Sequence, residues 1–371
     1  MDKRKFNQVR RLVVKVGSSS LTYATGKLNI GQIERLVGQL ADLRNRGLEV
    51  LLVTSGAIGA GMGRLGMSKK PRTIPEKQAA AAVGQGILLH MYEKIFAEYG
   101  VVVGQVLLTR EDFADRRRFL NARNALQTML RLQVIPVINE NDTVAVDEIK
   151  LGDNDNLAAM VAGLVDADLL VLLSDVDGLY DGKPGTPGAR VIKEVYEIDD
   201  RIEALAGGAG TIVGTGGMVT KIQAARIAMH SGLVTVIARA GEPDVIRRLV
   251  EGEPLGTAFW PSARLANKKK WIAYGATVSG RIFVDEGAAR ALQQNGKSLL
   301  PSGVTGVEGS FEMGSAVSVI APGGKEIARG IVNYSAAEVK KIMGRKTGEI
   351  AAILGHKAYD EVIHRDNLAL E

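Results

Sequence analysis

The sequence predicts an α/β protein: a three-layer αβα sandwich with a mostly parallel sheet, followed by a small, mainly β domain. Strand-like and helix-like segments alternate up to about residue 250, as expected of repeated strand–helix–strand units. The strand-like segments are continuous runs of Val, Ile and Leu, which is typical of strands covered by helices on both faces. Beyond about residue 260, short segments interrupted by glycine replace this pattern and indicate a second module.

The elements of the first module follow from these runs in order. The predicted strands are 12–16, 49–54, 101–107, 134–138, 168–173 and 233–237. The predicted helices are 30–46, 75–99, 121–131, 155–164 and 218–231. Pro75 stands at the start of the longest helix, where its missing N–H costs nothing. Ligands of parallel sheets bind outside the carboxyl ends of the strands, so the residues just after each strand are the candidates for a site.

The second module begins after a change of composition. Trp260-Pro261 and the stretch 264–270 separate it from the first module. Its short segments are 280–285, 298–301, 314–320 and 327–332. We therefore predict a first domain at 1–260, a linker at 261–276 and a second domain at 277–371. The basic run 268–270 fits a solvated linker better than a nucleic-acid site.

Composition excludes several classes of protein. The chain has 371 residues, 46% of them hydrophobic and 24% charged, as in soluble globular proteins. It has no cysteine, which excludes disulfides, thiolate nucleophiles and Cys-ligated zinc. No apolar stretch approaches the ~18 residues of a membrane helix, and the charged N-terminus does not resemble a signal peptide. A cytoplasmic protein without a membrane partner is expected, and its net charge of +6 allows an anionic substrate or nucleic acid.

Four familiar motifs are excluded. Gly61, Gly63 and Gly66 match G-x-G-x-x-G, but no strand directly precedes them and no acid follows about 20 residues later, as a dinucleotide site requires. Gly296-Lys297-Ser298 ends like a P-loop but lacks the first glycine. The four histidines have no zinc-like spacing, and there is no G-x-S-x-G elbow. These absences argue against a hydrolase or metalloprotease.

The first two strands end in residues suited to an anion. Lys15 lies inside an apolar strand and is followed by Gly17 and three serines. A buried lysine is costly unless it meets an anion, although a lysine that extends to solvent is the alternative. The second strand runs into Thr54-Ser55-Gly56, where small residues either let backbone N–H groups approach a ligand or form a plain tight turn.

The densest polar segments follow the fourth predicted strand. Asn139-Glu140-Asn141-Asp142 comes directly after it, and Gly152-Asp153-Asn154-Asp155-Asn156 follows about ten residues later. Amides and carboxylates together can hold the two charged groups of an amino acid, or a divalent metal through water. One residue of the second segment is alternatively a helix N-cap.

Two further segments suit a nucleotide. Ser174-Asp175 follows the next strand, and the glycine-rich stretch 214–217 leads through Thr220 and Lys221 into a helix. A glycine-rich loop at a helix N-terminus can bind phosphates, with Lys221 as a counter-charge. A mobile linker is the alternative.

Together these segments resemble the amino acid kinase family. The matching stretches are VVKVGSSSLT, VTSGAIGAG, PVINENDTVA, GDNDNLAAMVA, LLSDVDGLY and GTGGMVTK, which occur in the family's order over roughly residues 10 to 240. The tail resembles a PUA domain over roughly residues 277 to 357, through GRIFVDEGAARAL, KSLLPSGVTGVEGSF and IARGIVNYSAAEV. Within the family, this combination most resembles the members that phosphorylate free glutamate.

The resemblance implies roles for particular residues. Lys15 and Lys221 would flank the transferred phosphoryl group, and Asp155 would orient the two lysines. The acid substrate would be bound by Ser55, Asp142 and Asn154. ATP would be bound by Lys15, Ser174, Asp175, Thr215, Gly216, Gly217, Met218, Val219, Thr220 and Lys221. No protein-bound metal is expected, because Mg²⁺ would arrive with ATP.

The resemblance also implies an activity and partners. It predicts ATP-dependent phosphorylation of the γ-carboxylate of L-glutamate, the first step of proline biosynthesis, with proline as feedback inhibitor and a homo-oligomeric assembly. Two alternatives remain open. One is a related kinase for aspartate or N-acetylglutamate, and the other is an RNA-binding protein that acts through the PUA-like domain.

Overall fold

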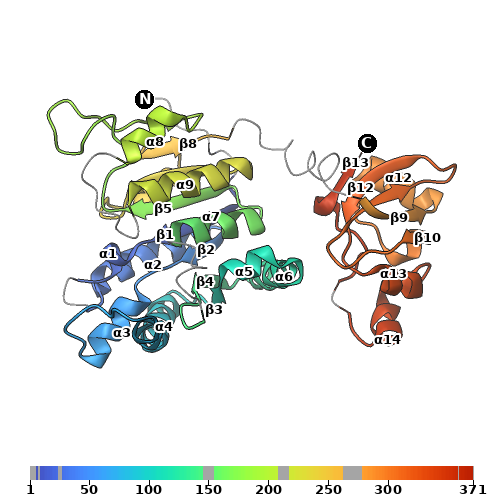
Figure 1. The fold of residues 1–371 in the computed structure, drawn as a ribbon, viewed down its shortest axis with the longest axis horizontal. Helices are drawn as coiled ribbons and strands as arrows, with labels where there is room; N and C mark the ends of the chain where they lie inside the picture. Colours follow the sequence, from blue (N-terminus) through green and yellow to red (C-terminus); the bar gives the residue numbers. More distant parts are fainter. Residues whose placement is uncertain are drawn as a thin grey trace. The chain divides into compact units, whose positions relative to one another are not determined.

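The computed structural model describes residues 6, 9–23, 27–144, 154–207, 217–261, 278–357 and 359–370, without the side chains of 116 and 366. The chain forms two compact units, Met1–Arg264 and Leu265–Glu371 (Figure 1). Apart from residue 261, the expected linker 261–276 lies outside the described residues, as does the basic run 268–270. Among the described helices, none is long and apolar enough to cross a membrane.

The N-terminal unit is built on one sheet with the order β3-β4-β2-β1-β5-β7-β8-β6. All its pairings are parallel except that of β7 with β8. This confirms the predicted mostly parallel sheet. The strands are β1 (Arg11–Val16), β2 (Glu49–Val53), β3 (Val103–Leu108), β4 (Ile135–Glu140), β5 (Leu169–Ser174), β6 (Glu194–Val195), β7 (Val234–Arg239) and β8 (Thr257–Phe259).

Helices cover both faces of this sheet. They are α1 (Ser18–Leu21), α2 (Ile30–Asn45), α3 (Ala57–Leu65), α4 (Ile74–Glu98), α5 (Arg110–Ala114), α6 (Arg116–Arg131), α7 (Asn154–Leu164), α8 (Asp200–Ala206), α9 (Met218–His230) and α10 (Val245–Val250). Side chains from α2, α4 and α10 form one core with the sheet, and side chains from α6, α7 and α9 form the other. The predicted three-layer sandwich is therefore confirmed.

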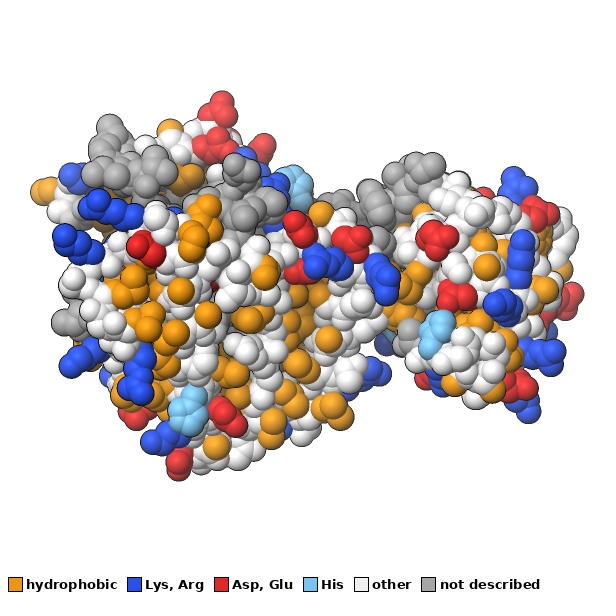
Figure 2. All heavy atoms as spheres, turned by 60° about the horizontal axis from the view of Figure 1, so that its bottom comes forward, with side chains coloured by type: hydrophobic (Ala, Val, Ile, Leu, Met, Phe, Trp, Pro, Cys, Tyr) orange, Lys and Arg blue, Asp and Glu red, His pale blue; other side chains and the backbone are white. Residues whose placement is uncertain are grey.

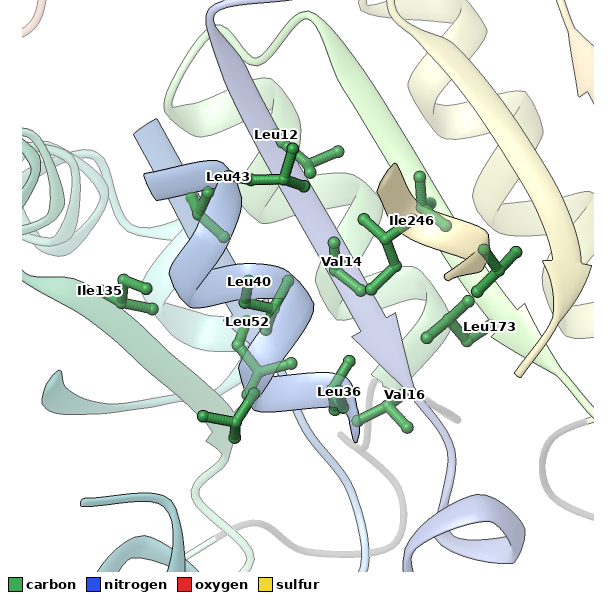
Figure 3. Packing of buried hydrophobic residues seen from close by; sticks show 14 of the residues in the cluster. Leu12, Val14, Val16, Leu36, Leu40, Leu43, Leu52, Ile135, Leu173 and Ile246 are labelled. Atoms are coloured by element: carbon green, nitrogen blue, oxygen red, sulfur yellow. The ribbon is translucent and has the colours of Figure 1, made fainter. Parts of the chain in front are cut away.

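The two cores use alternate residues of the same strands, because successive side chains of a strand point to opposite faces. On β1, Leu12 and Val14 pack with Leu40 of α2, as Figure 3 shows. Val13 packs in the opposite core, with α7 and α9. Lys15, two residues after Val13, is therefore directed to the α7/α9 face.

The helix that follows β2 was not predicted. The sequence suggested a tight turn or a ligand loop after Thr54, but α3 begins there, with Gly56 as N-cap at φ 96°. The glycines that match G-x-G-x-x-G, excluded above as a dinucleotide motif, lie in this helix and at its C-cap. A Cβ at Gly61 would lie 1.8 Å from the carbonyl oxygen of Ala80, so this glycine permits close packing of α3 on α4.

The short helices α1, α5, α8 and α10 and the short strands β6 and β8 were not predicted either. For the elements that were predicted, the boundaries were close. The largest error is at α6, which begins at Arg116 rather than Asn121, because Asp115 is the N-cap and its carboxylate accepts a hydrogen bond from the backbone N–H of Arg118. The longest helix starts as expected of Pro75, with a capping box between Thr73 and Glu76 in addition.

The C-terminal unit has its own sheet, with the order β10-β9-β11-β12-β13, and its own core. Its elements are β9 (Val278–Val284), α12 (Glu286–Asn295), β10 (Val304–Gly309), β11 (Ala316–Ile320), β12 (Glu326–Ile331), α13 (Ala336–Ile342), α14 (Ile350–Leu354) and β13 (Leu368–Leu370). The segment 298–301 is not a strand. Leu299 forms a single bridge with Ile363, and Pro301 begins a short 3-10 helix, Pro301–Gly303.

Candidate active site

The candidate site lies at the carboxyl edge of the central strands. β1 lies between β2 and β5, and β2 pairs with β4. Because these four strands run parallel, their last residues share one edge of the sheet. The order of the strands reverses beside β1, and ligands of α/β sheets bind at such switch points.

Three charged side chains meet at this edge in a buried cluster. The Nζ of Lys15 lies 2.5 Å from Oδ1 of Asp155, and the Nζ of Lys221 lies 3.0 Å from Oδ2 of the same carboxylate. Asp155 has no exposed surface, and the two lysines are only 2% and 5% exposed. The cluster therefore joins β1, the first turn of α7 and the first turn of α9.

The lysines determine the charge state of this carboxylate. Burial raises the pKa of Asp155, but the ammonium groups of Lys15 and Lys221 outweigh burial, and the net shift of its pKa is downward. The carboxylate is thus ionised at neutral pH. Two ammonium groups share one carboxylate, so these three groups together carry a net charge of +1 in a buried position. Such a site favours an anion.

A second cluster lies beside the first and is built from amide and hydroxyl groups. The side-chain Nδ2 of Asn154 lies 2.7 Å from the carbonyl oxygen of Thr54, 2.9 Å from Oγ of Ser55 and 2.8 Å from Oδ1 of Asn139. Asn154 directly precedes Asp155 at the start of α7. The structure thus brings together Ser55 and Asn154, two of the three predicted substrate residues, next to the charged cluster.

The third predicted substrate residue, Asp142, lies in the turn after β4 and is half-buried.

Two residues of the second cluster, Thr54 and Asn139, were not assigned a role from the sequence. Both are buried although both are polar, and both stand where a central strand ends. A polar residue at the end of an otherwise apolar run was the signal for them.

The predicted nucleotide residues lie around β5 and α9. Ser174 ends β5 and is buried, and its hydroxyl donates to Oδ1 of the exposed Asp175 at 3.2 Å. Helix α9 begins after its N-cap, Gly217, which has no side chain to cap the first N–H groups. Uncapped N–H groups at a helix N-terminus can bind phosphate.

Other residues of the predicted nucleotide loop differ in exposure. Met218 and Thr220 are half-buried and Val219 is exposed. The hydroxyl of Thr220 lies 3.1 Å from Oδ2 of Asp155, which ties the start of α9 to the charged cluster. The predicted residues Thr215 and Gly216 lie outside the described residues. Within the described part of the chain, no group of three or more His, Asp or Glu side chains could hold a metal ion.

Comparison with known families matches both units. The model of the amino acid kinase family matches residues 10–239, which contain all the site residues described above. The model of the PUA domain matches residues 280–354, in the C-terminal unit.

Full-length relatives are similar to this chain. A glutamate 5-kinase of Moorella thermoacetica is 59% identical over 98% of this chain and 96% of the relative. A glutamate 5-kinase of Carboxydothermus hydrogenoformans is 58% identical over 98% of both chains. Among solved structures, carbamate kinase from Giardia lamblia bound to AMP-PNP aligns with a TM-score of 0.51 and 16% identity, over 68% of this chain and 99% of that one. This last likeness concerns the fold alone.

Proposed function

This chain belongs to the amino acid kinase family, and from that premise we propose that it transfers the γ-phosphoryl group of ATP to the γ-carboxylate of L-glutamate. The product is L-glutamyl 5-phosphate, in the first step of proline biosynthesis. Its full-length relatives carry the name of this activity. The observation that carries the proposal is the buried cluster of Lys15, Asp155 and Lys221, which has the net positive charge that a transferring phosphoryl group requires.

The chemistry of the proposed acceptor explains why the cluster contains lysines and no general base. A glutamate side chain has a pKa of about 4.3, so it is already an anion at neutral pH. One of its carboxylate oxygens forms a bond to the γ-phosphorus as the bond from that phosphorus to the bridging oxygen of ADP breaks. No proton is transferred. The barrier comes from bringing two anions together, and fixed positive charge lowers it.

The lysines approach the reaction from two structural elements. We assign Lys15 on β1 and Lys221 on α9 to the transferring group, and Asp155 to holding both ammonium groups in place. ATP would be bound by Ser174, Asp175 and the start of α9, where the first backbone N–H groups suit its phosphates. Mg²⁺ would enter with ATP and neutralise charge on the phosphate oxygens.

We assign Ser55, Asn154 and Asp142 to the amino acid. The hydroxyl of Ser55 can donate to its α-carboxylate, and the side-chain oxygens of Asn154 and Asp142 can accept from its α-ammonium group. Aspartate is an alternative substrate, because it lacks one methylene group, which is worth only about 1–3 kcal/mol of discrimination in such a site. N-acetylglutamate, which has no α-ammonium group, is the other alternative.

The test is a trapping assay with a panel of acids. The purified protein is mixed with Mg-ATP, hydroxylamine and either glutamate, aspartate, N-acetylglutamate or no acid, and acyl phosphate is detected as the coloured iron–hydroxamate. Colour with glutamate alone is the expected result. Colour only with another acid would retain the chemistry and replace the substrate, and no colour with any acid would refute the proposed activity.

A second candidate function concerns the C-terminal unit, because PUA-like domains bind RNA in other proteins. This unit contains a cavity of about 820 Å³. Its lining includes Lys297 and Arg365 but also Asp285 and Glu361, so it is not a uniformly basic surface. RNA binding is therefore our secondary proposal. An affinity for RNA that falls steeply with salt would support it, whereas binding no tighter than that of an unrelated basic protein would refute it.

Three further properties belong to the proposal. Proline, the end product of the pathway, is proposed to inhibit the enzyme, and unchanged activity at millimolar proline would refute this. The use of ATP fits a cytoplasmic enzyme.

A homo-oligomer is also proposed. Figure 2 shows hydrophobic side chains exposed among uncharged ones on the N-terminal unit, and Leu65 of α3 is half exposed. A monomeric mass by light scattering would refute the oligomer.

A further inference from the structure

Helix α4 reaches the proposed substrate site through a buried tyrosine. Tyr92 has no exposed surface, and its phenolic oxygen lies 2.8 Å from Oγ1 of Thr54, just after β2. Burial raises the pKa of Tyr92 well above its usual range, against a smaller opposing effect of Thr54, so the phenol keeps its proton. The two residues are far apart in sequence, and the contact depends on how α4 packs against the sheet.

Thr54 connects Tyr92 to the proposed substrate residues through further hydrogen bonds. Its hydroxyl donates to the carbonyl oxygen of Ser55 at 3.3 Å, which leaves Oγ1 to accept from Tyr92. Its own carbonyl oxygen accepts from Nδ2 of Asn154 at 2.7 Å. An amide nitrogen has only two hydrogens, yet that of Asn154 has three acceptors within 2.9 Å. The position of the Asn154 side chain therefore depends on the positions of these three acceptor groups.

A second side chain of α4 contacts the site two helical turns earlier. Nε2 of Gln85 donates to the carbonyl oxygen of Glu140 at 3.2 Å, and Gln85 is also buried. Residues seven apart lie on the same face of a helix, so Gln85 and Tyr92 face the sheet together. One contacts the end of β4 and the other the end of β2, which are neighbouring strands.

We propose that α4 positions the acid-substrate site, and that Tyr92 is a positioning residue that acts on Asn154 through Thr54. The inference rests on the proposed function, because it takes Ser55 and Asn154 to bind the acid. The inference adds that the hydroxyl of Tyr92, on helix α4, holds this site in place, although α4 is not one of the segments at the strand ends. The hydrogen bonds found from Tyr92 through Thr54 to Asn154 in the described part of the chain do not include the nucleotide residues on β5 and α9. The two substrates should therefore respond differently to the loss of these bonds.

The test is Tyr92→Phe, which removes one oxygen and keeps the ring that fills the core. Loss of one buried hydrogen bond costs on the order of a five-fold change in an equilibrium, so the KM for glutamate should rise roughly five-fold while the KM for ATP stays unchanged. Thr54→Val removes the other partner and should give the same pattern. The double variant should be no worse than the more affected single variant, since both remove the same contact.

A matched control lies on the same helix. Tyr99 is the C-cap of α4 and is half exposed, so Tyr99→Phe should leave both KM values as in the wild type. A role of Tyr92 in packing alone would lower the unfolding midpoint without separating the two KM values. Equal changes in both KM values, or no change in either, would overturn the inference. The wild-type trapping assay is run first, and its failure would refute the proposed function independently.

Discussion

Asp155→Asn is the substitution that most directly tests the buried charged cluster. Asparagine has nearly the same size as aspartate but no charge. The carboxylate it replaces lies 2.5 Å from the Nζ of Lys15 and 3.0 Å from that of Lys221. An amide has an NH₂ group in place of one of the two carboxylate oxygens, so the lysine at that position would face a donor instead of an acceptor.

The expected loss of stability can be estimated from these contacts. Two unit charges about 4 Å apart attract by roughly 4 kcal/mol at an effective dielectric constant of 20, and the cost of burying the charges offsets part of this. Removing one partner of a buried ion pair costs about 3–5 kcal/mol, because it leaves a buried charge without compensation. We expect the free energy of unfolding to fall by that amount. The kcat should fall by roughly 10²-fold or more, as when a preorganised charge is lost from a site.

The assay is urea unfolding followed by circular dichroism, together with the hydroxamate assay. Asp42→Asn is the control, because it removes an exposed i,i+4 pair with Arg46, and such pairs contribute about 0.3–0.5 kcal/mol. If Asp155→Asn were as stable as Asp42→Asn, the cluster would not be the buried ion pair that its distances indicate. If its kcat were also that of the wild type, Asp155 would have no part in the reaction.

The pH dependence of this difference has a definite sign. The pKa of Asp155 is lower in the folded protein than in the unfolded chain, because the lysines outweigh burial. Its contribution is therefore complete above the unfolded pKa of about 3.9 and is lost as the pH falls toward the folded pKa. The advantage of the wild type over Asp155→Asn should be constant near neutrality and should shrink below about pH 4.

Three other substitutions test separate parts of the molecule. Lys221→Ala should lower kcat by roughly 10²-fold or more in a protein that circular dichroism shows to be folded, and a near-normal kcat would remove Lys221 from the mechanism. Asp142→Ala should raise the KM for glutamate more than that for ATP, and equal increases would count against a role in binding the acid. Gly84→Ala should lower the free energy of unfolding by about 1–3 kcal/mol, because its Cβ would lie 1.7 Å from the carbonyl oxygen of Ala57, and an unchanged urea midpoint would contradict this packing.

Much of the N-terminal fold could be predicted because its central strands β1, β2, β4 and β5 are buried on both faces. A run such as Leu169–Leu173 contains only apolar residues, and each of them is buried. Helix α3 was not predicted because its own residues do not favour a helix. It contains three glycines, which lower helix propensity by about 1 kcal/mol each. It is helical because α4 packs against it, a contact that no local pattern records.

Some residues of the candidate site could likewise be predicted from the sequence, and others could not. The polar residues that end central strands, such as Lys15 and Ser55, could be found because parallel strands bring their carboxyl ends to one edge. Tyr92 and Gln85 could not. On α4 they follow an Ala-rich pattern and look like ordinary core and surface residues. Their contacts join residues 38 and 55 positions apart, and only the packing of the helix on the sheet determines which polar groups they meet.

The glycines of the α3–α4 contact and the polar contacts of α4 are parts of one arrangement. With Gly61 and Gly84 in place, the backbones of the two helices approach closely, because a Cβ at either glycine would overlap the other helix. A helix held at that distance can reach the ends of β2 and β4 with its own side chains. Displacement of α4 by even 1 Å would break a hydrogen bond of 2.8 Å, such as that between Tyr92 and Thr54. The close packing of small residues, far from any reacting atom, is therefore a condition for the geometry of the substrate site.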